Sequence, residues 1–106
     1  MTVAVSEPAR LLILVDDPPR LSREEAGAWL REGLGKLPAV AGVESLEISP
    51  LEAAGPSWVT AGGWLIEFRV LDRAAARQLV HGAEGSALLA DFRQLGMHPS
   101  VQIVAG

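Results

Sequence analysis

Glu67 and Arg69 are a carboxylate and a guanidinium placed two residues apart in the stretch 64–71, whose even positions are all large and apolar. Period-two alternation predicts a β-strand with one apolar face and one mixed face. The two charged groups would lie about 7 Å apart on the mixed face. They suit an acid–base and anion-recognition pair. The other interpretation is structural: Arg69 forms an ion pair with Glu47 on a neighbouring strand, and paired charges are commoner than catalytic ones.

The sequence contains two histidines, the side chains that titrate near neutral pH without any perturbation. His98 precedes Pro99 at the entry to the predicted last strand, so it would lie at a sheet end and is our candidate general base. His81 ends a predicted helix, where a positive charge is favourable. Asp16 and Asp17 follow the first predicted strand; they suit a cavity rim, although a turn explains them adequately. Because cysteine is absent and the histidines are far apart, we predict no metal site.

Three further residues complete the predicted ligand-binding set. Trp58 lies in the glycine-rich stretch 53–63, where an exposed aromatic side chain would serve as a lid or as a subunit contact. Glu47 and Gln102 are polar positions on two predicted strands. Trp64 could stack on a planar ligand, but it shares its face with apolar residues and is predicted to belong to the core.

Composition predicts a single globular domain. Of 106 residues, 49% are hydrophobic and 21% charged. We expect residues 1–9 to be a flexible lead-in and residues 10–106 to form the domain. The net charge of −4, without a cluster of Lys or Arg, argues against nucleic acid and anionic membranes as partners. Neither a spanning apolar run nor a signal-like start is present, so we expect a cytoplasmic protein. Separately, we expect no cofactor.

The hydrophobic pattern predicts alternating strands and helices. A capping box, Ser22 to Glu25, starts the first helix, with Trp29 as its expected packing anchor. Gly96 is the expected end of the last helix. The predicted strands are 10–16, 43–51, 64–71 and 99–105, and the predicted helical stretches are 23–37, 73–80 and 88–95, the last two separated by an interruption at 81–85.

This order predicts an α+β ferredoxin-like fold, βαββαβ, with a four-stranded antiparallel sheet and its helices on one face. The first and third strands would lie in the middle. The first strand is aliphatic from Leu11 to Val15, so one of its faces would be left without a helical cover: either Leu12 and Leu14, or the other three residues. A second copy packing on that face is the simplest remedy, and we predict a homodimer.

Several segments carry a resemblance to a known family: Leu14–Glu25, Trp29-Leu30, Leu37-Pro38 and Gly42–Leu46. Over roughly residues 10–105 the sequence resembles the dimeric α/β-barrel superfamily. Within it, the resemblance is strongest to the EthD-like and stress-responsive barrel proteins. The resemblance implies that two sheets face each other in a homodimer and enclose a small-molecule cavity. Members include cofactor-independent monooxygenases, lactone isomerases, cyclases and haem-degrading enzymes. Their recurrent histidines, on the first strand or first helix, have no counterpart here, so no catalytic residue is carried over.

Two functions from different classes follow. The first is a small-molecule-binding barrel, such as a cofactor-independent monooxygenase, isomerase or cyclase, acting on a small hydrophobic or aromatic metabolite through His98, Glu67 and Arg69. The second is a non-catalytic homodimeric accessory or stress-related module whose sheet face is a packed interface without a cavity.

Overall fold

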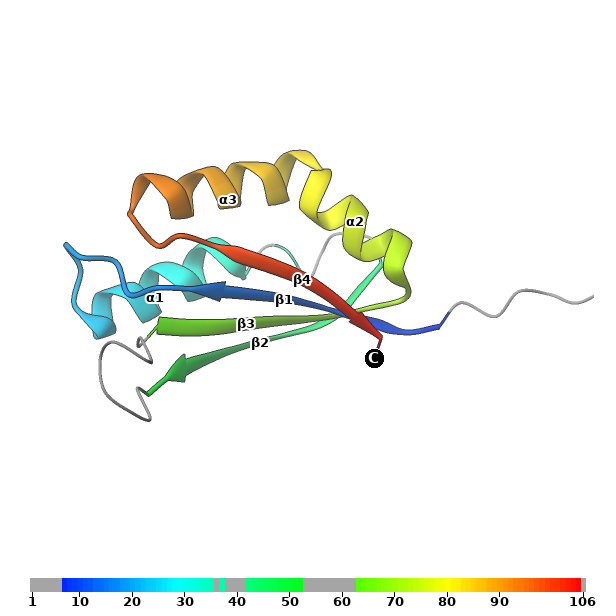
Figure 1. The fold of residues 1–106 in the computed structure, drawn as a ribbon, viewed down its shortest axis with the longest axis horizontal. Coiled ribbons are helices and arrows are strands. Elements are labelled where there is room, and N and C mark those ends of the chain that lie inside the picture. Colours follow the sequence, from blue (N-terminus) through cyan, green and yellow to red (C-terminus); the bar gives the residue numbers. More distant parts are fainter. Residues whose placement is uncertain (1–6, 36, 38–41, 53–62, 106) are drawn as a thin grey trace, which may run out of the picture.

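The computed structural model describes residues 7–35, 37, 42–52 and 63–105 (Figure 1). The described elements follow the predicted order, including the division of the second helical region into two helices. They are β1 (Ala9–Val15), α1 (Arg23–Leu34), β2 (Val43–Leu51), β3 (Gly63–Val70), α2 (Arg73–His81), α3 (Ala83–Gln94) and β4 (Ser100–Ala105). The predicted α+β ferredoxin-like fold is confirmed.

The strands form one antiparallel sheet in the order β2-β3-β1-β4. The first and third strands therefore occupy the middle, as predicted from the right-handed crossovers. β2 is an edge strand, which accommodates Pro50 because an edge position does not need every backbone amide for pairing.

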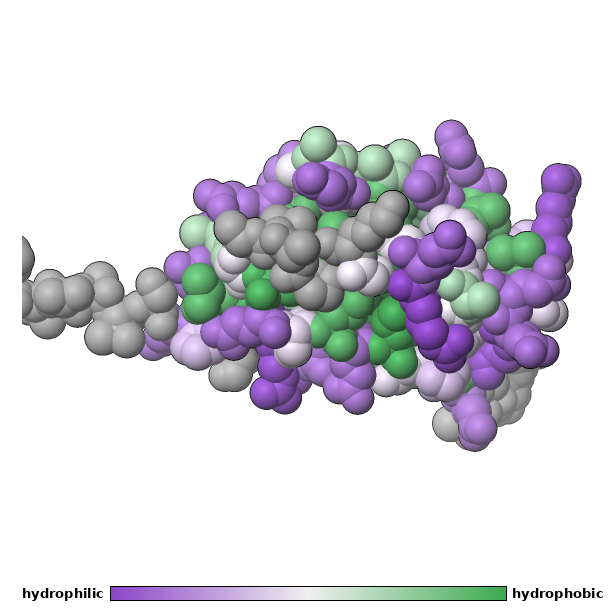
Figure 2. Space-filling view, turned by 180° about the vertical axis from the view of Figure 1, so that it is seen from behind, coloured by the Kyte–Doolittle hydropathy of each residue, from purple (hydrophilic) through white to green (hydrophobic). Residues whose placement is uncertain are grey.

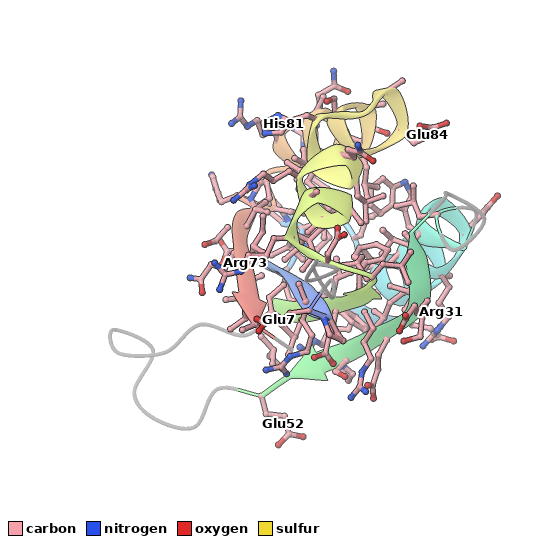
Figure 3. The ribbon with its side chains drawn as sticks, turned by 90° about the vertical axis from the view of Figure 1, so that its right-hand side faces the viewer. Glu7, Arg31, Glu52, Arg73, His81 and Glu84 are labelled. Atoms are coloured by element: carbon pink, nitrogen blue, oxygen red, sulfur yellow. The ribbon has the colours of Figure 1, made fainter. Side chains whose placement is uncertain are left out.

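The described helices lie on one side of the sheet, as the view nearly along the strands shows (Figure 3). The core lies between these two layers. Its fully buried large side chains come from the central strands, the helices and the turn between α3 and β4: Phe68, Phe92, Leu11, Leu30, Leu34, Ile66, Met97 and Val70. Trp64 is only 5% exposed, so its predicted place in the core is correct.

The start of α1 is set by the predicted capping box. The Ser22 hydroxyl accepts from the Glu25 amide, and the Glu25 carboxylate accepts from the Ser22 amide. These hydrogen bonds hold the pKa of Glu25 below its usual value. The helix ends at Leu34, one turn earlier than predicted. Leu30 and Leu34 are its fully buried anchors, whereas Trp29 is half-buried and meets Phe92 edge to face at 5.7 Å.

The second helical region is interrupted only at Gly82, a shorter break than the predicted 81–85. Asp72 caps α2 by accepting from the Ala75 amide. Gly96 has φ +76 and follows the end of α3, which confirms its role as the terminating glycine.

The structure settles which face of β1 is left uncovered. Leu11, Ile13 and Val15 face the helices and are buried. Leu12 and Leu14 project from the other side, and Leu14 is 37% exposed. We call this helix-free side of the sheet the open face; it carries the side chains of β1 and β3 that share the direction of Leu12 and Leu14.

Two glycines give a matched test of these packing assignments. At Gly63 (φ +146) a Cβ would lie 2.1 Å from the Val15 carbonyl oxygen, whereas at Gly33 it would meet only Leu88 Cδ1 at 4.0 Å. We predict that Gly63→Ala lowers the free energy of unfolding by more than about 1 kcal/mol, because the backbone cannot keep its conformation. Gly33→Ala should raise it by up to about 1 kcal/mol. Urea unfolding followed by circular dichroism measures both, and equal effects would contradict the assignments.

Candidate functional site

One row of side chains on the open face crosses the whole sheet. It runs from Glu47 on β2 through Glu67 on β3 and Leu12 on β1 to Gln102 on β4. Neighbouring strands are about 4.8 Å apart, so adjacent members of this row are within contact distance. The structure thus brings together three of the residues that the sequence analysis proposed for a ligand site.

Two further rows flank this one. On one side Arg69 stands directly opposite Arg10, and on the other Leu65 stands opposite Leu14. The edge strands contribute small or aliphatic side chains at these levels: Ser45, Ser49, Ser100 and Val104. The open face therefore combines an apolar half, around the leucines, with a charged half.

The charged half is held by an ion pair that the sequence analysis missed. Arg10 Nη1 donates to Glu67 Oε1 at 3.0 Å, with the two side chains 39% and 17% exposed. The predicted pair of Arg69 with Glu47 is wrong within the described residues: Glu47 stands opposite Glu67, and Arg69 stands opposite Arg10. The signal was available in sequence, because Arg10 shares the parity of Leu12 on the same strand.

This ion pair positions Glu67 more than it stabilises the sheet. A partly exposed pair of this kind contributes at most about 1 kcal/mol. Its effect on geometry is more definite, because the bond to Arg10 directs the Glu67 carboxylate toward β1. Arg69 and Glu47 form no ion pair among the described residues.

The second cluster lies at the end of the sheet where β1 finishes and β4 begins. His98 Nδ1 is 3.2 Å from Asp16 Oδ2, and the Asp16 amide donates to the Met97 carbonyl at 2.7 Å. Both side chains are exposed, at 80% for His98 and 53% for Asp16. An ionised carboxylate only accepts, so Nδ1 is the donor of this contact, and Nε2 is the ring nitrogen that Asp16 does not engage.

His98 also has an unusual backbone. Its φ is +45, a conformation that costs a residue with a side chain about 1 kcal/mol or more. The backbone bond between Asp16 and Met97 holds the turn in place. The structure thus supplies the fixed partner that no local sequence pattern gave to this histidine.

The two clusters are separate. Leu12, beside Glu67, and Asp16, beside His98, are four residues apart along one extended segment, or about 13 Å. Glu67 and Arg69 therefore belong together on the sheet, and His98 with Asp16 forms a second group at one end.

Arg23 organises the sheet end that carries His98. Its guanidinium donates to the carbonyl oxygens of Leu51 and, at 2.9 Å, of Gly63. It also bonds Asp17 at 3.4 Å and lies 5.5 Å from the centre of the Trp64 ring. This single side chain ties the end of β2 and the start of β3 to the first turn of α1.

Some predicted residues lie elsewhere. Trp58 falls outside the described residues. His81 lies at the end of α2, on the helix side and away from the sheet (Figure 3). Within the described ranges no group of three or more His, Asp or Glu side chains is placed to hold a metal ion. The helices of the described part are all too short or too polar to cross a membrane.

A hollow lies between α1 and α3, on the helix side of the molecule rather than on the open face. Seen from behind, most of the surface is polar and the apolar groups form separate patches (Figure 2). The hollow measures about 470 Å³, and carboxylates of Glu32, Glu84 and Asp91 surround an apolar floor that includes Leu88. These carboxylates are solvated helix-surface groups, so this hollow does not match the predicted site.

Comparison with known proteins shows the fold but not a family. No protein-family model matches the sequence, and neither does any curated protein. Among solved structures, a hydroxynitrile lyase from Passiflora edulis superposes with a TM-score of 0.70 at 12% identity, covering 94% of each chain. An ethyl tert-butyl ether D (EthD) family protein from Bacillus halodurans gives 0.66 at 14% identity, covering 93% of this chain and 98% of that one. A dimeric ferredoxin-like protein of unknown function from Thermobifida fusca gives 0.70 at 15% identity, covering 95% and 92%.

These likenesses extend over nearly the whole chain, at identities where only the fold is shared. They confirm the predicted resemblance to ferredoxin-like, EthD-type proteins at that level. A shared fold alone fixes neither the activity nor the site residues.

The contact between His98 and Asp16 predicts a specific tautomer. At alkaline pH, where the ring is neutral, His98 should carry its proton on Nδ1, because the Asp16 carboxylate accepts from that atom. Long-range ¹⁵N–¹H NMR reads this directly, with the exposed His81 as an internal reference. Asp16→Ala should return His98 to the tautomer ratio of His81, and Asp17→Ala should leave it unchanged. The contact is refuted if the two histidines of the unmodified protein show the same ratio.

Proposed function

We propose that this protein is a homodimer in which two open faces meet and enclose a chamber that binds a small organic molecule. The observation that carries the proposal is the mixed character of the open face, where leucines and charged side chains share an uncovered sheet. The description of the Thermobifida fusca structure as dimeric supports the same assembly on the same fold.

The apolar half of the open face accounts for the dimer. Leu12, Leu14 and Leu65 are neighbours on the two central strands, and no described helix covers them. Each fully buried leucine contributes about 1.5–3 kcal/mol relative to its exposed state. A two-fold axis would present the same leucines from both subunits, which makes a second copy the natural cover.

The charged half argues against a dry interface. Arg10, Arg69, Glu47 and Glu67 would be repeated by the second copy, so a tightly packed contact would remove many charges from water. The penalty is several kcal/mol for each ion, and good pairing is needed to offset it. A chamber that keeps these groups solvated or bound to a ligand avoids that penalty. This favours the ligand-binding barrel over the alternative, a non-catalytic module with a packed face.

The chemistry we propose is proton transfer to or from the bound molecule. The free Nε2 of His98, supported by Asp16, suits a general base, and the Glu67 carboxylate held by Arg10 is a second candidate. Isomerisation and cyclisation of a small hydrophobic or aromatic metabolite are reactions that such a base can start. One solved structure with a similar fold is an enzyme, the hydroxynitrile lyase from Passiflora edulis.

Native mass spectrometry of the purified protein, with a denatured control, tests the proposal. We expect a mass of two chains plus a small non-covalent adduct that disappears on denaturation. A bare dimer that also binds no added small molecule would favour the accessory module. A clean monomer would refute the sheet-to-sheet assembly.

A matched pair of variants tests the interface itself. We predict that Leu14→Glu raises the dimer dissociation constant by more than about tenfold, because it adds a buried charge to both subunits. Ala74→Glu adds the same charge at an exposed position of α2 and should leave the dimer intact. Sedimentation velocity measures assembly, and circular dichroism checks that both variants remain folded. Equal behaviour of the two variants would contradict the proposed interface.

A further inference from the structure

Arg10 and Arg69 face each other directly across β1 and β3, an arrangement that needs a counter-charge. Like charges at opposite positions of an antiparallel pair destabilise a sheet. Glu67 supplies one counter-charge through Arg10 Nη1. Arg10 Nε is shielded from solvent and has no acceptor among the described residues, and the Arg69 side chain forms no hydrogen bond or ion pair with them. The protein thus leaves this pair of guanidiniums incompletely satisfied.

A cavity of about 380 Å³ lies against these two arginines. Its walls come from the start of β1, the end of β3 and the start of β2, and the lining residues are Pro8, Ala9, Arg10, Glu44, Arg69 and Val70. The register of β2 shifts between Val43 and Ser45, so Glu44 is a bulged residue at this wall. The volume falls within the range of small-molecule sites.

We propose that Arg69, assisted by Arg10, binds the carboxylate of the ligand at this end of the chamber. The inference rests on the proposed function and adds the chemical class of the ligand: a monocarboxylate with an apolar body. A planar guanidinium matches a carboxylate through two parallel hydrogen bonds. The apolar body would extend along the sheet toward Leu12 and Leu14, the first of which lies about 7 Å from Arg10.

The charges around the cavity favour a single negative charge on the ligand. Glu67 already neutralises Arg10, so Arg69 is the one cation of this pair without a partner among the described residues. Glu44 lines the same cavity, and Glu47 lies two residues from Ser45, the neighbour of Arg69. These carboxylates would repel a dianion such as a phosphate monoester more strongly than a monoanion.

The test compares an acid with its uncharged isostere. Phenylacetate and phenylacetamide are titrated into the unmodified protein, with binding followed by NMR. We expect phenylacetate to bind at least about tenfold more tightly than phenylacetamide, because hydrogen bonds between charged groups contribute more than those to a neutral amide. Arg69→Gln should abolish this difference by weakening phenylacetate binding alone. Arg73→Gln removes an exposed arginine of α2 and should preserve it.

The outcomes separate this inference from the proposed function. Equal affinities for the two compounds, or a preference for the acid that survives in Arg69→Gln, would overturn the carboxylate site while leaving the chamber in place. So would a dimer that binds phenylacetamide but not phenylacetate, or binds neither. A monomer in native mass spectrometry would instead remove the chamber on which both proposals rest.

Discussion

β1 imposes the constraint on which the rest of the structure depends. It lies between β3 and β4 in the middle of the sheet and carries aliphatic side chains on both faces. The helices bury one of these faces, where Leu11 and Ile13 join the core. None of the described helices covers the other face, where Leu14 is 37% exposed (Figure 3). The second face is therefore available for assembly and binding.

Antiparallel pairing then decides which groups share that second face. Because side chains alternate with a period of two, the position of Leu12 fixes Arg10 on β1 and, through the register, Glu67 and Arg69 on β3. A shift of one residue would bury these charges against the helices and expose Ile66 and Phe68 instead. The burial of the hydrophobic core thus sets the geometry of the charged half of the open face.

Sequence patterns predicted the fold well because its determinants are local. Alternation along residues 64–71 defined β3, and the Ser22–Glu25 capping box defined the start of α1. Side-chain partners were harder. The predicted pairing of Arg69 with Glu47 was wrong because it assumed strand adjacency without a register. The register that runs unbroken from Ser45 to Leu51 places Ser45 opposite Arg69 and Glu47 opposite Glu67.

The contact between His98 and Asp16 shows which part of a site the strand order predicts and which part it leaves open. The two residues are separated by 82 positions in sequence, yet β1 ends at the place where its antiparallel neighbour β4 begins. The predicted strand order therefore brings the two segments to the same end of the sheet. It does not bring the two side chains into contact, because that requires the left-handed backbone of His98 and the hydrogen bond from the Asp16 amide to Met97. Both features form only when the turn is complete. A non-glycine residue in the left-handed conformation has a higher backbone free energy, and the contacts around it must offset that cost.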